Sequence, residues 1–337
     1  MSTEGGHSPM VHPTAHVRAD GYMPHVAAVV NPRSGGGYTG RAWRRIASEL
    51  EKHLGPVRVH FTGSPSSPHY LPAAELTRQA LREGAQLVIA VGGDGTINEV
   101  VNGFYEGDEQ INPDAHLAIL NCGTGGDFRR TFGFPQEWEK GIAHIASGNT
   151  RRIDIGRLRF IAEDGRETTR YFDNIASFGM SGAVDRAVNR ATWQKNFGGS
   201  FTFFWCSMMA MLGYRPREVR IKTDTGIDEE MTVGTCAVAN GRFFGGGMMI
   251  APKAEPDDGM FDVTVLMDMG MWDFLKDSGS IYKGTHIDNP KVFTDRVRWL
   301  EAEPLGDKPV LLDVDGEAPG RLPARFEILP GALTLRV

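Results

Sequence analysis

The chain has 337 residues, of which 41% are hydrophobic and 23% are charged, with a formal net charge of -6. This composition is typical of a folded globular protein, and the length predicts about two domains. The net negative charge argues against a nucleic-acid partner, because phosphate backbones select basic surfaces. The cysteines Cys122, Cys206 and Cys236 form no CxxC pair, which predicts neither a disulfide framework nor a zinc site.

Residues 1–23 are rich in Gly, Pro, Ser and His and lack the apolar segment of a signal peptide. We expect a flexible N-terminal tail, with a metal-binding histidine tract as the alternative. No run of about 18 consecutive apolar residues occurs, so we expect no transmembrane helix.

Residues 24–150 alternate apolar runs with helical patterns. The runs are apolar throughout, which is typical of strands buried on both faces of a parallel sheet. The predicted strands are Val26–Val30, Val57–Phe61, Leu87–Val91 and Leu117–Leu120. The predicted helices begin at an N-cap Thr39, and span about Pro72–Glu83 and Ile97–Tyr105.

Residues 151–320 contain shorter, alternating strands with few helices between them, which predicts a mainly antiparallel β-sandwich domain. The fold class expected is therefore an α/β N-terminal domain with a parallel sheet, followed by this sandwich, with the boundary near Gly148–Arg151. From about Ile153 onward the predicted strands are Ile153–Phe160, Arg170–Phe178, Glu218–Thr223, Thr232–Ala239, Phe261–Met267, Asp295–Glu301, Val310–Val314 and, in the segment after residue 320, Arg325–Ile328.

The segment Phe201–Leu212 is apolar nearly all round but too short to span a bilayer. A buried core helix is the default interpretation, and the wall of an acyl-chain groove is the alternative, because Met and Phe adapt to flexible apolar ligands. Arg215, Arg217 and Arg220 follow the segment and could face anionic headgroups.

Three glycine-rich turns follow predicted strands, at Asn31–Gly37, Gly92–Thr96 and Gly123–Asp127. Glycines let backbone N–H groups approach a phosphate, and the helix that follows adds its positive end. An ordinary strand-to-helix turn is the alternative for the first of them. Ligands bind beyond the carboxyl ends of parallel strands, so we expect the three turns to converge on one crevice.

The turn Gly92–Thr96 has the most specific pattern, because two glycines end a buried strand and Asp94 follows them. An N-cap role for Asp94 explains neither the glycines on both sides nor the Asn98 and Glu99 that come next. An aspartate here can position a Mg²⁺-bound nucleotide while neighbouring N–H groups hold phosphate oxygens. The string predicts nucleotide binding.

The third turn adds polar groups to the same crevice. Thr124 could donate to a phosphate, and Asp127 could hold a metal-bound water. Arg129 and Arg130 follow, where they could neutralise phosphate charge. A solvated basic turn is the alternative for the two arginines.

Two acidic strings lie in the second half. Ala251–Phe261 contains an Asp-Asp-Gly turn that could bind a hard cation such as Mg²⁺, with a plain turn at Gly259 as the alternative. Asp313–Glu317 offers a carboxylate that could remove a proton from an attacking hydroxyl, although alone it could be only an acidic turn.

Together these strings resemble the diacylglycerol kinase catalytic family, in its bacterial soluble lipid kinase branch. The resemblance covers about residues 24–337 and is carried by seven strings in family order. These strings are Asn31–Gly35, Gly92–Gly103, Gly123–Phe128, Asn174–Gly179, Ala239–Gly247, Ala251–Gly259 and Asp315–Glu317.

The resemblance implies that ATP binds in the cleft between the two domains. It implies that Asp94 and Asp127 organise a catalytic Mg²⁺ and that Glu317 is the general base. It assigns the ligands of a structural Mg²⁺ to Glu255, Asp258 and Met260. The implied ATP-binding residues are Asn31, Pro32, Arg33, Ser34, Gly35, Thr62, Gly92, Gly93, Asp94, Gly95, Thr96, Asn98, Glu99, Gly123 and Thr124.

The resemblance also implies that residues 321–337 return to the first domain, which divides the chain into 24–150, 151–320 and 321–337. One departure lies in the third turn, where Gly126 stands in place of the family's usual Asn. Loss of that amide could weaken a loop-closing hydrogen bond by about 1 kcal/mol. Asn121-Cys122 also replaces a more usual Pro-containing pair.

The expected activity is transfer of the ATP γ-phosphate to a lipid hydroxyl, with diacylglycerol as the first candidate and ceramide or a sphingoid base as alternatives. A remoter alternative is a soluble acceptor, as in NAD kinases and phosphofructokinases, which share the Gly-Gly-Asp-Gly loop but lack the Asp-Gly-Glu string. Another is a nucleotide- or lipid-binding regulator without catalysis. We expect a cytoplasmic protein, peripheral to the inner face of the membrane, with a homodimer left open.

Overall fold

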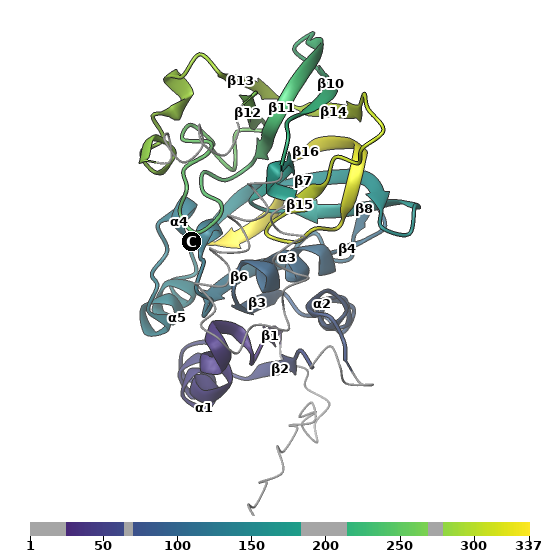
Figure 1. Ribbon diagram of the computed structural model, residues 1–337. Helices are drawn as coiled ribbons and strands as arrows, with labels where there is room; N and C mark the ends of the chain where they lie inside the picture. Colours follow the sequence, from purple (N-terminus) through teal and green to yellow (C-terminus); the bar gives the residue numbers. More distant parts are fainter. Residues whose placement is uncertain (1–24, 64–69, 183–213, 269–278) are drawn as a thin grey trace, which may run out of the picture.

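The computed structural model describes residues 25–63, 70–182, 214–268 and 279–337. It has an α/β part and a β-rich part, stacked end to end (Figure 1). The α/β part contains β1 (Val26–Val30), α1 (Ser34–Leu54), β2 (Val57–Phe61), α2 (Ala73–Arg82), β3 (Leu87–Gly92), α3 (Asp94–Gly103), β4 (Tyr105–Glu106), β5 (Glu109–Gln110), β6 (His116–Asn121), α4 (Asp127–Phe132) and α5 (Trp138–Ala146).

The strands β2, β1, β3 and β6 form a parallel sheet in that order. Successive residues of each strand face opposite sides, so Ala28 and Val30 pack with α1 and α5, whereas Ala27 and Val29 pack with α2 and α3. Both faces are buried, which explains why these strands are apolar throughout. The described helices are all too short or too polar to cross a membrane.

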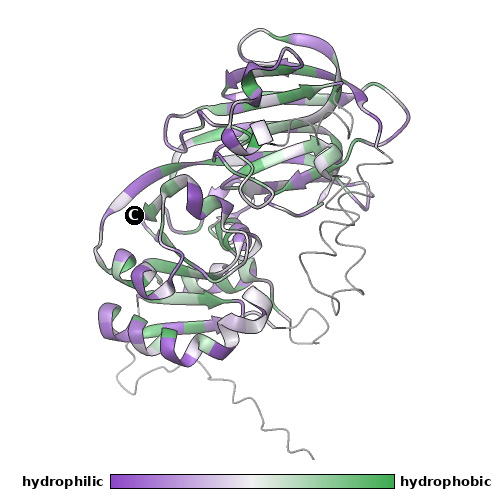
Figure 2. Ribbon diagram, turned by 60° about the vertical axis from the view of Figure 1, so that its left-hand side comes forward, coloured by the Kyte–Doolittle hydropathy of each residue, from purple (hydrophilic) through white to green (hydrophobic). Residues whose placement is uncertain are grey.

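The β-rich part is mainly antiparallel. Its elements are β7 (Thr150–Ala162), β8 (Glu167–Phe172), β9 (Ile175–Gly179), β10 (Arg217–Thr223), β11 (Asp228–Ala239), β12 (Phe261–Met267), η2 (His286–Asp288), β13 (Val292–Val297), β14 (Trp299–Pro304), β15 (Leu312–Val314) and β16 (Gly320–Arg336). Phe172 stacks on Phe261 inside its core, with ring centroids 5.4 Å apart. Apolar residues line the strands of both parts (Figure 2).

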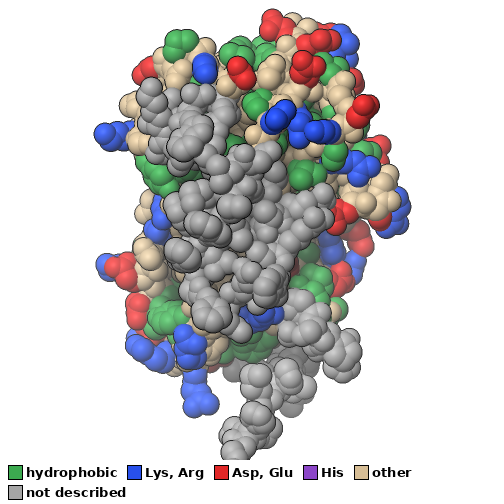
Figure 3. All heavy atoms as spheres, viewed as in Figure 1, with side chains coloured by type: hydrophobic (Ala, Val, Ile, Leu, Met, Phe, Trp, Pro, Cys, Tyr) green, Lys and Arg blue, Asp and Glu red, His purple; other side chains and the backbone are tan. Residues whose placement is uncertain are grey.

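One strand belongs to both parts. β16 pairs antiparallel with β14 near its start and with β7 along most of its length. Its last residues, Thr334 and Leu335, pair in parallel with His116 and Leu117 of β6. A single sheet therefore runs from the β-rich part into the parallel sheet. Over the β-rich part, at the top of Figure 3, acidic and basic side chains are interspersed.

The fold class predicted from the sequence is confirmed, and the four strands of the first domain lie where they were expected. The N-cap prediction for Thr39 is wrong. Gly35, Gly36 and Gly37 have positive φ and kink the start of α1, and the Thr39 hydroxyl donates to the Ser34 carbonyl oxygen at 3.2 Å instead of capping a backbone N–H.

Two predicted strands are each divided. Arg170–Phe178 breaks into β8 and β9 at Asp173 and Asn174, and Asp295–Glu301 breaks into β13 and β14 at Arg298. At the first break the Asn174 amide donates to the Phe243 carbonyl oxygen at 2.9 Å, and at the second the Arg298 backbone N–H donates to the Asp224 carboxylate at 2.9 Å. The sequence prediction also lacked α4 and α5, and the segment Phe201–Leu212 lies outside the described residues.

Candidate active site

The three glycine-rich turns meet at the carboxyl ends of β1, β3 and β6. The Asn31 amide donates to the Thr96 hydroxyl at 3.1 Å, which joins the first turn to the second. A Cβ atom on Gly123 would lie 2.5 Å from the Cα atom of Gly93, so the second and third turns touch through their backbones. Only glycine permits this approach.

Asp94 begins α3 and holds the third turn in place. One of its carboxylate oxygens accepts hydrogen bonds from the backbone N–H groups of Gly126 at 2.7 Å and Asp127 at 3.2 Å. Its other oxygen, Oδ1, is buried and has no hydrogen-bond partner among the described residues. A buried carboxylate oxygen without a donor suits a cation, so the position of Asp94 fits a Mg²⁺ ion that accompanies a nucleotide.

Asp127 joins the third turn to the β-rich domain. Its Oδ1 atom pairs with Arg130 at 2.5 Å, and its Oδ2 atom accepts the backbone N–H of Gly246 at 2.7 Å. Burial raises the pKa of the Asp127 carboxyl, and the nearby Asp94 charge raises it further. Asp127 therefore lies where the two domains meet, next to Asp94.

Glu317 reaches the same place from the β-rich domain. Asp315 and Gly316 have positive φ and turn the chain sharply before it. The Glu317 Oε1 atom lies 3.7 Å from where a Cβ of Gly95 would be, and its Oε2 atom accepts a hydrogen bond from Arg170 at 2.5 Å. A carboxylate from the second domain thus faces the first turn of α3, and its role as general base stays a prediction.

Two predicted nucleotide contacts have structural partners instead. Asn98 is fully buried, and its amide nitrogen donates to the Asp315 carboxylate at 2.7 Å and to the Tyr171 carbonyl oxygen at 3.0 Å. The Glu99 carboxylate accepts the backbone N–H of Ala73 at 2.6 Å, at the start of α2, and burial raises its pKa. The Asn98 side chain therefore joins α3 to the β-rich domain, and the Glu99 side chain joins α3 to the start of α2.

The remaining predicted nucleotide contacts lie in or beside the turns. Arg33 and Thr124 are exposed, and Thr62 is buried at the end of β2. The Thr62 backbone N–H donates to the Val30 carbonyl oxygen at 2.9 Å, which keeps it beside the first turn.

In the turn proposed to bind a second metal ion, the Asp258 carboxylate already pairs with an arginine, Arg296 of β13. Asp258 pairs with Arg296 through one oxygen and accepts the Met260 N–H at 3.0 Å through the other. Arg296 also lies 3.4 Å from the Asp262 carboxylate. Among the described residues no three His, Cys, Asp or Glu side chains form a metal cage. Glu255, Asp258 and Met260 remain a predicted metal set, and we assign no chemical step to it.

Sequence reasoning missed a buried pair of carboxyl groups beneath Glu317. The Asp173 backbone N–H donates to the Asp315 carboxylate at 3.3 Å, and Asp315 also accepts the Ile175 N–H at 2.8 Å. Burial raises the pKa of Asp315 to about 6 and that of Asp173 well above its usual range, so the pair holds a proton at mildly acidic pH. An Asp-Asn step between Phe172 and Ile175 was the available signal.

Gly126 has φ of +72°, and the space beside it is filled. A Cβ on Gly126 would lie 2.8 Å from the Asn121 amide nitrogen and 2.9 Å from Arg129 Nε. Asn121 is itself buried at the end of β6. The two departures from the family pattern, at 121 and 126, are therefore neighbours in space, and the Asn121 amide lies next to the position where the usual asparagine would begin.

Two family models match the chain. Residues 25–158 match the diacylglycerol kinase catalytic domain, and residues 174–337 match the YegS C-terminal NAD kinase beta sandwich-like domain. The border between the two matches lies in β7 and β8, close to the change from parallel to antiparallel pairing.

Curated relatives extend over most of the chain. A diacylglycerol kinase of Mycobacterium tuberculosis strain H37Rv is 29% identical over 310 residues, covering 91% of this chain and 93% of the relative. A probable lipid kinase YegS-like of Shewanella frigidimarina is 30% identical over 258 residues, covering 76% and 77%. A crystal structure of a putative diacylglycerol kinase from Bacillus anthracis shares the fold, with a TM-score of 0.71, 23% identity, and coverage of 92% and 96%.

Proposed function

Because the chain belongs to the diacylglycerol kinase catalytic family and is a lipid kinase of that family, we propose that it phosphorylates diacylglycerol to phosphatidic acid. The observation that carries the proposal is the approach of Glu317 to the first turn of α3, beside Asp94 and the glycine-rich turns. This arrangement puts a carboxylate from one domain against the first turn of α3 in the other, beside the turns that we propose to bind phosphate. A reaction that moves a phosphoryl group to a hydroxyl needs both.

The turns would hold ATP through backbone N–H groups at the start of α3, whose positive end favours the phosphates. Mg²⁺ bound with the nucleotide beside Asp94 would neutralise charge on the phosphate oxygens. The acceptor oxygen would form a bond to the γ-phosphorus while the bond to the bridging oxygen of ADP breaks. Glu317 would take the proton from the acceptor hydroxyl.

The acceptor is the finer part of the proposal. Two relatives, from Mycobacterium tuberculosis and Bacillus subtilis, are named diacylglycerol kinase, and each aligns over at least 90% of this chain. That shared name favours diacylglycerol over ceramide or a sphingoid base. A diacylglycerol acceptor would also bring the protein to the inner surface of the membrane as a peripheral enzyme.

The test is incubation of the full chain with Mg-ATP and phosphatidylcholine vesicles that contain diacylglycerol, ceramide, sphingosine or phosphatidylglycerol. We expect labelled phosphatidic acid from the first set, with the Glu317→Gln variant lowering the rate by about 10²–10⁴-fold. Faster phosphorylation of another lipid would replace diacylglycerol as the acceptor. No phosphorylated lipid from any vesicle, with ATP still bound, would favour a binding protein without catalysis.

A further inference from the structure

Arg170 lies on β8, at the place where this strand crosses α3. The side chain is 19% exposed. Its Nε and Nη2 atoms both donate to the Asn98 side-chain oxygen, at 3.3 and 2.9 Å. Nη2 also donates to Glu317 Oε2 at 2.5 Å. One guanidinium group thus contacts a helix of the first domain and the predicted base of the second.

These contacts are part of a closed ring. Asn98 accepts from Arg170 through its oxygen and donates through its nitrogen to Asp315 at 2.7 Å. Asp315 is two residues before Glu317, and Glu317 returns to Arg170. The backbone of Asp315 to Glu317 therefore cannot shift relative to α3 unless at least one of these hydrogen bonds breaks. The planar guanidinium fork suits this geometry because it fixes two partners at once.

Glu317 lies near another negative charge, and the Arg170 guanidinium offsets the repulsion between the two carboxylates. Glu99 from α3 repels Glu317, and Tyr70, which precedes α2, lies near both carboxylates. The positive charge of Arg33, from the turn after β1, also lies near Tyr70, but the Arg33 side chain is exposed to solvent. Arg170 is the cation that hydrogen-bonds to Glu317 directly. Without it, Glu317 would turn away from Glu99 and toward solvent.

We propose that Arg170 is a positioning residue for phosphoryl transfer, which holds the Glu317 carboxylate against the first turn of α3 through Asn98. The kinetic consequence rests on the proposed function. Arg170 acts on the reaction through Glu317, so its loss should slow the chemical step and leave nucleotide binding nearly unchanged. The ring itself exists whether or not the acceptor is diacylglycerol.

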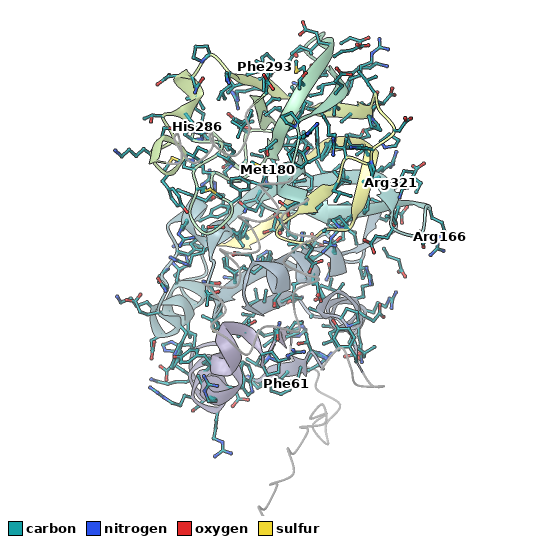
Figure 4. The ribbon with its side chains drawn as sticks, in the orientation of Figure 1. Phe61, Arg166, Met180, His286, Phe293 and Arg321 are labelled. Atoms are coloured by element: carbon teal, nitrogen blue, oxygen red, sulfur yellow. The ribbon has the colours of Figure 1, made fainter. Side chains whose placement is uncertain are left out.

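The first experiment compares kcat and KM for Arg170→Met, Arg170→Lys and Arg166→Met in the full chain. We expect Arg170→Met to lower kcat by about 10²-fold while the KM for ATP changes by less than about 2-fold. Arg170→Lys should be intermediate, because one ammonium group can reach Glu317 but cannot also make both bonds to Asn98. Arg166, at the exposed tip of the β7–β8 hairpin (Figure 4), pairs with Asp164 and should leave both constants unchanged.

Chemical rescue separates positioning from general damage. Guanidinium ion at millimolar concentration should restore roughly 10-fold of the activity of Arg170→Met and none of that of Glu317→Gln. An unchanged kcat in Arg170→Met would overturn the proposal. A lowered kcat without rescue, together with a matching fall in Tm, would also overturn it, because the residue would then be structural only.

A second measurement needs no kinase activity. In a double-mutant cycle on thermal unfolding, Arg170→Met and Asn98→Ala should together lower Tm no more than the more severe single variant. Additive losses would contradict the ring. If this cycle shows coupling while no lipid is phosphorylated, the proposed function fails and the contact between Arg170 and α3 stands.

Discussion

The edge proposed to bind ATP, called here the nucleotide edge, and the side proposed to receive the acceptor, called the acceptor side, are built in different ways. The edge at β1, β3 and β6 consists of glycine turns whose backbones touch, and the Asp94 carboxylate ties the second turn to the third. The acceptor side consists of side chains, Asn98, Arg170, Asp315 and Glu317, which meet from distant parts of the chain. Backbone sites are therefore sensitive to added volume, whereas side-chain networks are sensitive to lost charge or hydrogen bonds.

The largest expected effect is at Asp94. This residue is an exception to the contrast between the two sides, because its side chain holds together turns that otherwise meet through their backbones. Asp94→Ala removes the acceptor for two backbone N–H groups and the negative charge that suits a cation. We expect kcat to fall by about 10³-fold, measured with saturating ATP and lipid. The Asp94→Asn variant keeps an oxygen that can accept the Gly126 N–H, so its kcat should fall less than that of Asp94→Ala. If Asp94→Ala retained more than a tenth of the activity, the side chain would have no central role at this edge.

The next effect tests whether the nucleotide edge needs glycine where the second and third turns touch. Gly123→Ala places a methyl group 2.5 Å from the Gly93 Cα atom, so the two turns must separate. We expect kcat/KM for ATP to fall by about 10²-fold. Gly306→Ala is the matched control, because a Cβ there meets nothing within 4 Å and φ is not positive. Equal kinetics for both variants would show that the contact between turns does not matter.

A smaller effect is expected where the chain departs from its family. Gly126→Asn restores the usual residue but directs its Cβ at the Asn121 amide and Arg129 Nε. We expect a loss of about 1–3 kcal/mol in the free energy of unfolding, measured by denaturant titration. Asn121→Ala in the same chain should recover part of this loss. If the double variant were no more stable than Gly126→Asn alone, the two positions would be independent.

The smallest effect concerns the acceptor side and depends on pH. The pKa values of Asp173 and Asp315 are raised in the folded protein, so the folded state binds more protons than the unfolded state. The contribution of this pair to stability is therefore largest below the normal aspartate pKa and is lost as pH rises through about 6. Asp173→Asn removes one ionisation and should raise Tm by about 2–4 °C at pH 8.

The control for this prediction is the same variant at pH 4, where both carboxyl groups of the wild type are largely protonated. We expect little or no gain in Tm there. A gain of equal size at both pH values would mean that the amide packs better than the acid, without any linkage to ionisation.

The sequence predicted the convergence of the glycine-rich turns because the information for it is local. The strand Leu87–Gly92, the glycines after it and Asp94 are consecutive, and parallel pairing brings the turns of neighbouring strands to one edge. The kink at Gly35 to Gly37 was not predicted, because a run of glycines does not indicate which φ each will adopt.

The acceptor side was predicted only in part. The Asp-Gly-Glu string identified Glu317, but Arg170 lies in an alternating run that predicts an ordinary strand. Its partners Asn98 and Glu317 are 72 and 147 residues away. Such contacts depend on how β8 crosses α3, and a single sequence does not specify that crossing. The break at Asp173 was visible as polar residues inside an apolar run, but its consequence was not.

The path of β16 has a consequence for the order in which the molecule can be made. The strand beside β6 in the parallel sheet is formed by residues 334 and 335, which are synthesised after the other described strands of both parts. Until those residues leave the ribosome, β6 has an unpaired edge, although everything else in its sheet has long been available. The first domain therefore cannot be completed before the second has been made, and the two must reach their final structure together.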